Sequence, residues 1–299
     1  ISGELSSISK ATPPNDPWKA PGMHLKVDIY VNSSSLEGRE RFMRLFKRGK
    51  EMTDDFFREH VQKHTHLYIP ESQRKTYYET IVATKSDETE KVGVIKKIAI
   101  EHMIKVFEGT ETTGKENILT HIEQSRDAVD VMIDLVQNKS MNDIQKILGD
   151  LSYHDTYTYD HSINVCLYAI VFYKYLKPNA TRYELITSGL SGLLHDLGKV
   201  RVSNKILNNV GPLNEWDFGV IKKHPEYGAK LISSCNCEEL STEMLAEVQA
   251  VVLQHHENIN GTGYPLGLVG NEISFLSKVI AIIDFFDAVT TKRSYHEPL

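Results

Sequence analysis

The sequence has few cysteines and no long apolar run. Its 299 residues include only three cysteines, Cys166, Cys235 and Cys237. Three are too few for a disulfide scaffold or a four-cysteine zinc site, so we expect a reducing, cytoplasmic location. The longest uncharged apolar stretch covers residues 165–173 and is far shorter than the roughly 20 residues needed to cross a bilayer. We therefore expect no membrane span.

Positive charge is not in excess either. The chain carries 34 lysines and arginines against 40 aspartates and glutamates, which gives a net charge of −6. A protein that coats nucleic acid needs a basic surface, so a nucleic acid polymer is not an expected partner. A small anionic ligand is compatible with this balance, because a few local cations or metal ions suffice to bind it. With 40% hydrophobic and 25% charged residues, the composition is that of a folded globular protein.

The N-terminal part of the chain predicts a flexible arm followed by a small domain. Four of the ten prolines fall within residues 1–22, which predicts an arm without regular structure. Residues 24–31 alternate apolar and polar side chains, as a strand does. Residues 39–50 carry six cations among apolar residues at helical spacing, which favours an amphipathic helix with a solvated basic face over an anion-binding patch. Residues 23–86 are thus expected to form a small α+β regulatory domain.

The pattern becomes helical from about residue 88 and stays helical to the end. Residues 87–115 are expected to form a connecting helix, and a second helix is predicted to run through residue 136. The remaining chain is typical of a helical bundle with loops. The fold class is therefore mainly α: an all-α helical bundle preceded by the small α+β domain.

Histidines and aspartates in the second half of the chain suggest a metal site. Imidazole nitrogens and carboxylate oxygens are ligands that iron, manganese and zinc accept, and a pair of metals needs about seven of them. The candidates are His161, His195, Asp196, His224, His255, His256 and Asp284.

Helical phase indicates that several of these side chains meet. Thr181 to Glu184 form a capping box that opens a helix leading to His195, with Gly198 as its natural stop. His255 and His256 each follow a valine of an apolar stripe by four residues, and Asp284 follows Ile280 in the same way. Each residue alone could be a core or capping residue. Their recurrence on buried faces of separate helices favours a shared metal site.

Two motifs resemble a known family. The segment His195-Asp-Leu-Gly-Lys199 is similar to the HDxGK motif of the HD superfamily of metal-dependent phosphohydrolases. Residues 255–265, His-His-Glu-Asn-Ile-Asn-Gly-Thr-Gly-Tyr-Pro, resemble the HHExxDGxGYP signature of its HD-GYP branch. Segments at 155–165, 224–228 and 284–288, with 293–295, agree with the family in order and spacing. By this resemblance, residues 116–299 form an HD-GYP domain.

The resemblance implies a function and a set of site residues. The family implied is one of bacterial signalling enzymes, which hydrolyse cyclic di-GMP with two or three metal ions, usually iron or manganese. The seven residues named above would be the ligands, with Asp196 bridging two metals. A metal-bridging hydroxide would attack phosphorus. Lys199, Tyr264 and Arg293 would contact the substrate.

Two departures from the family pattern bear on this expectation. Tyr157 stands where some members have a glutamate ligand for a third metal, so the resemblance implies a binuclear site. Asn260 replaces the aspartate of the signature and is expected to keep its loop-capping role, because both residues make such turns.

Alternative functions follow from the same residues. The chain could be a metal-loaded but catalytically weak module that binds cyclic di-GMP, or that docks a diguanylate-synthesising domain through the Gly-Tyr-Pro loop. It could also hydrolyse another cyclic dinucleotide or a nucleotide. An assay with cyclic di-GMP and manganese or ferrous iron separates turnover from binding alone.

Overall fold

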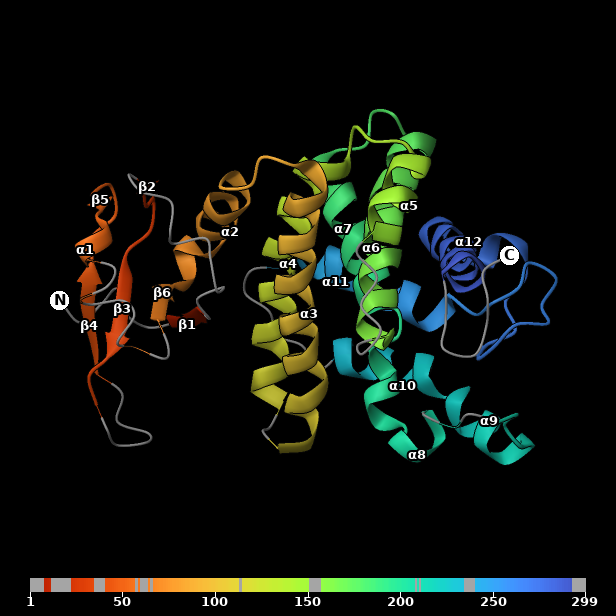
Figure 1. Ribbon diagram of the computed structural model, residues 1–299. Helices are drawn as coiled ribbons and strands as arrows, with labels where there is room; N and C mark the ends of the chain where they lie inside the picture. The colour runs from red at the N-terminus through yellow and green to blue at the C-terminus, as the bar shows by residue number, and fades with distance from the viewer. Residues whose placement is uncertain are drawn as a thin grey trace. The chain divides into compact units, whose positions relative to one another are not determined.

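The structure, a computed structural model, divides the chain into two units, Ile1–Val94 and Ile95–Leu299 (Figure 1). The residues it describes are 8–11, 23–34, 41–56, 59, 64, 67–112, 115–150, 157–207, 209, 211–233 and 240–291.

The N-terminal unit is built on antiparallel strands. A four-stranded sheet has the order β1-β6-β3-β4, and a separate pair joins β2 to β5. The strands are β1 (Ile8–Ala11), β2 (Met23–His24), β3 (Ile29–Asn32), β4 (Phe42–Phe46), β5 (Glu51–Met52) and β6 (Leu67–Pro70). The helices are α1 (Asp54–Phe56), η3 (Glu71–Gln73) and α2 (Arg74–Ala83). Alternate residues Ile29 and Val31 of β3 are buried, as the period of a strand requires.

Three expectations for this unit need correction. The helix predicted over residues 39–50 is wrong, because Phe42–Phe46 forms strand β4 and pairs with β3. Its cations suit an edge strand, where charge discourages pairing with another chain. The strand expected over 24–31 is split between β2 and β3. Within the expected arm, Ile8–Ala11 pairs with β6.

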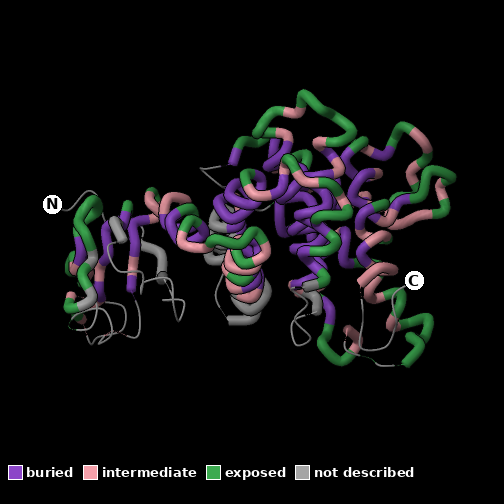
Figure 2. Tube along the Cα trace, turned by 45° about the horizontal axis from the view of Figure 1, so that its top comes forward, coloured by how far each residue is buried: buried purple, intermediate pink, exposed green. Residues whose placement is uncertain are grey.

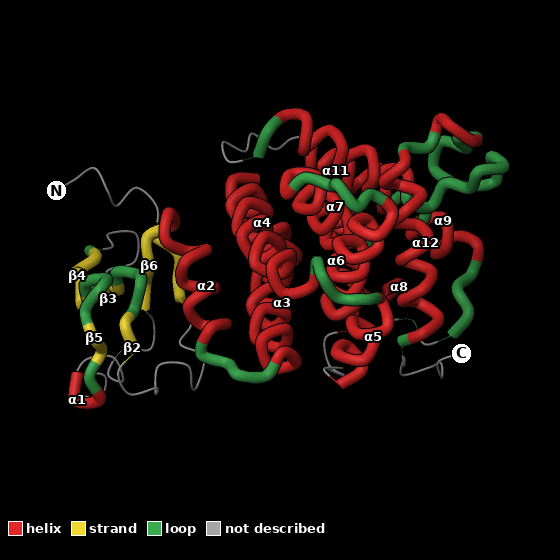
Figure 3. Tube along the Cα trace, turned by 90° about the horizontal axis from the view of Figure 1, so that it is seen from above, coloured by secondary structure: helices red, strands yellow, loops and turns green. Residues whose placement is uncertain are grey.

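The C-terminal unit is a bundle of helices. Its elements are α3 (Glu88–Thr112), which begins in the N-terminal unit, α4 (Lys115–Val136), α5 (Met141–Asp150), α6 (Tyr157–Leu176), α7 (Arg182–Leu194), η4 (Leu197–Arg201), α8 (Asn204–Leu207), α9 (Glu215–Ile221), α10 (His224–Ser233), α11 (Thr242–Gln254), η5 (Gly270–Glu272) and α12 (Phe275–Thr290). Helix α6 packs against α4, α5, α7 and α12, at the middle of the bundle (Figure 3). The predicted fold class, a helical bundle after a small α+β part, is confirmed.

Burial explains the longest apolar run of the sequence. Residues 160–171 of α6 are all buried, and Figure 2 shows buried segments running through the middle of the helical unit. The run at 165–173 therefore belongs to the core of the bundle. Among the residues that the structure describes, no helix is both long enough and apolar enough to cross a membrane.

Candidate metal centre

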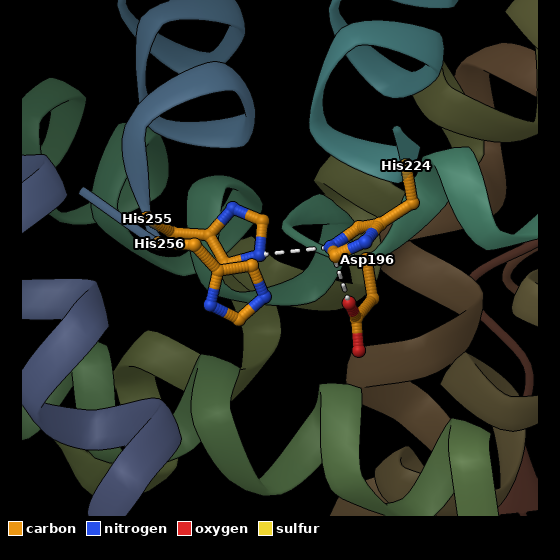
Figure 4. A group of neighbouring side chains, drawn as sticks. All are labelled: Asp196, His224, His255 and His256. Carbon is orange, nitrogen blue, oxygen red and sulfur yellow. Dashed lines mark hydrogen bonds and ion pairs between the residues drawn. The ribbon is translucent and has the colours of Figure 1, made fainter. Parts of the chain in front are cut away.

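The seven histidines and aspartates predicted from the sequence come together inside the C-terminal unit. They come from α6, the turn after α7, the start of α10, the turn after α11, and α12. Their possible ligand atoms form two groups, and within each group all atoms lie within 4.8 Å of one another. The first group is Asp196, His224, His255 and His256 (Figure 4), and the second is His161, His195 and Asp284.

Helix caps place these side chains. Thr181 and Glu184 form the predicted capping box, with the Thr181 hydroxyl accepting from Glu184 N at 3.2 Å and the Glu184 carboxylate accepting from Thr181 N at 2.8 Å. The helix that starts there brings His195 to its C-terminal end. Ser241 caps α11 by accepting from Met244 N at 3.2 Å. These caps set where α7 and α11 begin, and the two helices end at His195 and His255.

Gly198 brings two parts of the centre close together. We expected it to stop a helix, but its backbone is not left-handed. A Cβ at this position would overlap the carbonyl oxygen of His224. Glycine is needed here because the turn that carries Asp196 approaches the backbone at the start of α10.

Three histidines have a fixed tautomer. Each ring Nδ1 bonds the backbone carbonyl oxygen three residues earlier. The pairs are His195 with Gly192 (2.7 Å), His224 with Ile221 (2.7 Å) and His255 with Val252 (3.0 Å). A carbonyl oxygen can only accept, so Nδ1 carries the proton, and Nε2 presents a lone pair whenever the ring is neutral. Such bonds are typical of metal-binding histidines.

The resulting lone pairs fit a cation. His224 Nε2 and His255 Nε2 lie 3.2 Å apart, the contact drawn between the rings in Figure 4. Burial and the neighbouring His256 hold the pKa of His255 well below its usual range, so its ring is neutral. His195 Nε2 is buried without a hydrogen-bond partner among the described residues. Two facing lone pairs and an unpaired buried nitrogen are costly unless a positive ion lies among them. The donor set therefore fits a metal centre.

Asp196 faces both groups. Its Oδ1 lies 3.3 Å from His224 Nε2, and its Oδ2 lies 3.3 Å from His195 Nε2. Lys199 Nζ is 2.5 Å from the same Oδ2. Burial alone would raise the pKa of Asp196, but the Lys199 ammonium holds it well below its usual range. The buried carboxylate is therefore ionised and can offer one oxygen to each side.

His161 lies between two carboxylates of α12. Its Nδ1 is 2.7 Å from Asp287 Oδ2, and its Nε2 is 3.1 Å from Asp284 Oδ1. Burial opposes protonation of the ring, but the two carboxylates outweigh it and raise the pKa of His161 to about 9. His161 itself helps to hold the pKa of Asp284 well below its usual range, against the effect of burial.

Sequence reasoning assigned no role to Asp287 or Asn164. Asp287 is fully buried and accepts from Asn164 Nδ2 at 3.0 Å. Both residues could have been found by spacing, because Asp287 follows Asp284 by three residues and Asn164 follows His161 by three. Residues three apart share one face of a helix.

The C-terminal unit is similar to known proteins. Residues 166–299 match the model of the HD domain family. A cyclic di-GMP phosphodiesterase of Pseudomonas aeruginosa is 42% identical over 142 residues. The aligned segment makes up 47% of this chain and 32% of that relative. The C-terminal unit belongs to the HD-GYP family. The 3'3'-cGAMP-specific phosphodiesterase 3 of Vibrio cholerae is 32% identical over 139 residues. The aligned segment makes up 46% of this chain and 28% of that relative. This chain thus matches under a third of the length of these two relatives.

The chain also resembles a solved structure in fold. The HDG"Y"P protein from Bdellovibrio bacteriovorus has a TM-score of 0.55 and 17% sequence identity. The match covers 96% of this chain and 89% of that chain.

Cations and an aromatic ring lie beside the HD-GYP centre. The Tyr264 ring stacks on His256 with ring centroids 4.8 Å apart. Lys222 Nζ lies 5.3 Å from the Tyr264 ring centroid and 4.7 Å from that of Phe218. Sequence reasoning missed Lys222, whose only signal is its position two residues before His224. Arg293 and the Tyr157 side chain lie outside what the structure describes.

Side chains of the HD-GYP signature hold its loop. Asn260 Oδ1 accepts from Thr262 N at 3.2 Å and from Thr262 Oγ1 at 2.7 Å, which confirms the expected turn-forming role. Gly261 has a φ of +77°, a conformation that favours glycine. The Glu257 carboxylate accepts backbone N–H groups of Leu266, Gly267 and Leu268 at 2.6, 3.2 and 2.9 Å. The loop that carries Tyr264 is therefore anchored next to the metal centre.

Proposed function

We propose that this chain hydrolyses cyclic di-GMP with two metal ions held in the HD-GYP unit. The proposed ligands are His161, His195, Asp196, His224, His255, His256 and Asp284. The observation that carries the proposal is the placement of Asp196, whose two oxygens each lie 3.3 Å from a histidine of a different ligand group. A carboxylate placed in this way can bridge two ions. Iron or manganese suits a donor set of imidazoles and carboxylates.

The residues of the chain prepare the site for phosphodiester hydrolysis. When bound, the two ions would make hydroxide available near neutral pH and offset negative charge on the phosphoryl oxygens. The backbone carbonyls bonded to His195, His224 and His255 already hold these rings in the tautomer that presents Nε2. Asp196 stays ionised, and Lys199 places an ammonium group 2.5 Å from it. That ammonium group can stabilise charge that develops on the phosphate in the transition state.

The surroundings of the centre support a cyclic dinucleotide as substrate. Such a molecule combines phosphodiester anions with purine bases. Lys199 and Lys222 supply positive charge, and the Tyr264 ring supplies an aromatic surface beside His256. The names of the two curated relatives, which specify cyclic di-GMP and 3'3'-cGAMP, support this class. Arg293 is proposed as a further substrate contact.

A second candidate function is favoured by exposed apolar side chains around the signature loop. Ile259, Leu266 and Val269 are 70%, 54% and 49% exposed. An apolar surface of this kind suits a protein partner. A metal-loaded module with weak turnover could dock a diguanylate-synthesising domain through this loop.

Product analysis tests the proposed function. The full chain is purified without chelators, supplied with Mn²⁺ or Fe²⁺ under anaerobic conditions, and incubated with cyclic di-GMP or 3'3'-cGAMP. Chromatography should show linear dinucleotide or mononucleotide from cyclic di-GMP. A folded Asp196→Ala variant is the control for contaminating activity.

The two candidates give different results. Turnover of cyclic di-GMP that the Asp196→Ala variant lacks supports the enzyme. Tight binding of cyclic di-GMP without product supports the binding module. Hydrolysis of 3'3'-cGAMP alone would replace the proposed substrate with the other dinucleotide.

A further inference from the structure

Helix α3 carries a lysine that is buried in the helical bundle. The Lys96 side chain is 1% exposed and its ammonium lies 3.1 Å from Asp160 Oδ1 on α6. A buried ammonium is costly unless it is paired, and removal of one partner leaves the other charge uncompensated. The pair therefore fixes Lys96 of α3 against Asp160 of α6. Asp160 directly precedes the candidate ligand His161.

A chain of side-chain contacts continues from Lys96 to His161. Lys96 Nζ lies 3.4 Å from Asn164 Oδ1, and Asn164 Nδ2 donates to Asp287 Oδ1 at 3.0 Å. The other oxygen of Asp287 lies 2.7 Å from His161 Nδ1. Three contacts therefore connect the ammonium on α3 to the ring on α6.

Lys96 and Asp287 together decide which way the Asn164 amide points. With the observed orientation, the amide oxygen faces the ammonium and the amide NH₂ faces the Asp287 carboxylate. The flipped orientation would set NH₂ against an ammonium and oxygen against a carboxylate, and both contacts are repulsive. Without Lys96, one of these two restraints is gone and the donor to Asp287 is less firmly held.

We propose that Lys96 is a positioning residue for the metal ligand His161, acting through Asn164 and Asp287. It keeps the Asp287 carboxylate aligned on His161 Nδ1, so that Nε2 is presented to the metal. Because α3 begins in the N-terminal unit, the same contacts give that unit a physical route for regulating the metal centre. This inference rests on the proposed metal centre.

Metal affinity tests the proposal directly. The variant Lys96→Met/Asp160→Asn removes both buried charges together and so avoids an unpaired ion. Metal-stripped full-length wild type and variant are titrated with Co²⁺ or Mn²⁺. We expect one of the two sites to bind about tenfold more weakly, as for lost outer-shell partners of metal ligands, and the other to be unchanged. In metal-free ¹⁵N-labelled protein above pH 9, where the His161 ring is neutral, His161 should show a mixture of tautomers in the variant and one tautomer in the wild type.

Two further variants make the test specific. Asn164→Leu removes the intermediate step, so it should weaken the same site, and the Lys96→Met/Asp160→Asn change should add little in its background. If the double variant does not fold, the metal affinity of Asn164→Leu alone tests the inference. The control is Arg182→Gln, which breaks a 2.6 Å pair with Asp134 between α7 and α4 and touches no candidate ligand. It should lower stability without changing either metal affinity.

Three results would overturn the inference. Wild-type affinities in the folded double variant, or in Asn164→Leu, mean that Lys96 does not position His161. An equal loss of affinity in Arg182→Gln means that general destabilisation is the cause. Wild-type protein that binds no metal would overturn the proposed function as well, whereas two metals in the wild type with no change in the variants would overturn this inference alone.

Discussion

Replacement of Asp287 by asparagine should convert His161 to the tautomer that cannot bind a metal. Asp287 Oδ1 accepts from Asn164 Nδ2 at 3.0 Å and from Thr291 Oγ1 at 2.8 Å. In Asp287→Asn, the amide oxygen keeps these two donors, so its NH₂ group takes the place of Oδ2 beside His161 Nδ1. Two N–H donors cannot bond to each other. A neutral His161 ring therefore carries its single proton on Nε2, where Asp284 Oδ1 lies 3.1 Å away and can accept it.

The size of the effect follows from the loss of this outer contact. Outer-shell partners of metal-bound histidines typically change metal affinity by about 10- to 100-fold, or roughly 1.4–2.7 kcal/mol. Asparagine has nearly the shape of aspartate, so packing around the fully buried position 287 is retained. The loss should fall on the group of His161, His195 and Asp284, while the group around His224 keeps its affinity.

Calorimetric titration of the metal-stripped protein measures the two affinities. Thr291→Val is the matched control, because it removes one donor to Asp287 and leaves the carboxylate beside His161 intact. It should cost about 1 kcal/mol of stability and leave metal binding unchanged. Wild-type affinity at both sites in a folded Asp287→Asn variant would refute the reasoning about the tautomer.

Three further predictions concern other parts of the centre. Asp196→Ala should abolish metal binding at both positions, because its two oxygens face both groups; a folded variant that retains two metals by elemental analysis contradicts the bridging role. Asn260→Asp should leave metal content unchanged and alter turnover or KM modestly, since either residue can accept from the turn; a rise from no detectable hydrolysis to rapid turnover would favour the binding module. Gly198→Ala should lower the free energy of unfolding by about 1–3 kcal/mol because its Cβ overlaps His224, whereas Gly219→Ala, which meets open space, should not lower it in the same denaturation assay.

Local sequence signals predicted the parts of the centre that lie at helix ends. The capping box at Thr181 and the stripe that includes Val251 and Val252 set the phase of α7 and α11. Because the helical period carries that phase to the last turn, His195, His255 and His256 could be expected to face a common core.

Features that depend on contacts between distant parts of the chain could not be predicted from local patterns. The segment at 39–50 has apolar spacing compatible with a helix, and only its pairing with β3 makes Phe42–Phe46 a strand. The role of Lys96 depends on packing of α3 against α6, which no short stretch of sequence contains. Lys222 is likewise notable only because Tyr264, far along the chain, lies beside it.

The metal content of the full chain tests the proposed two-metal centre most directly. Protein purified without chelators and reconstituted with Mn²⁺ or Fe²⁺ should hold two tightly bound ions per chain by elemental analysis, because Asp196 has one oxygen for each of two ligand groups. Three tightly held ions would contradict the binuclear site, and a single ion would contradict the bridging role of Asp196. Folded protein that holds no ion at all would contradict the metal centre itself.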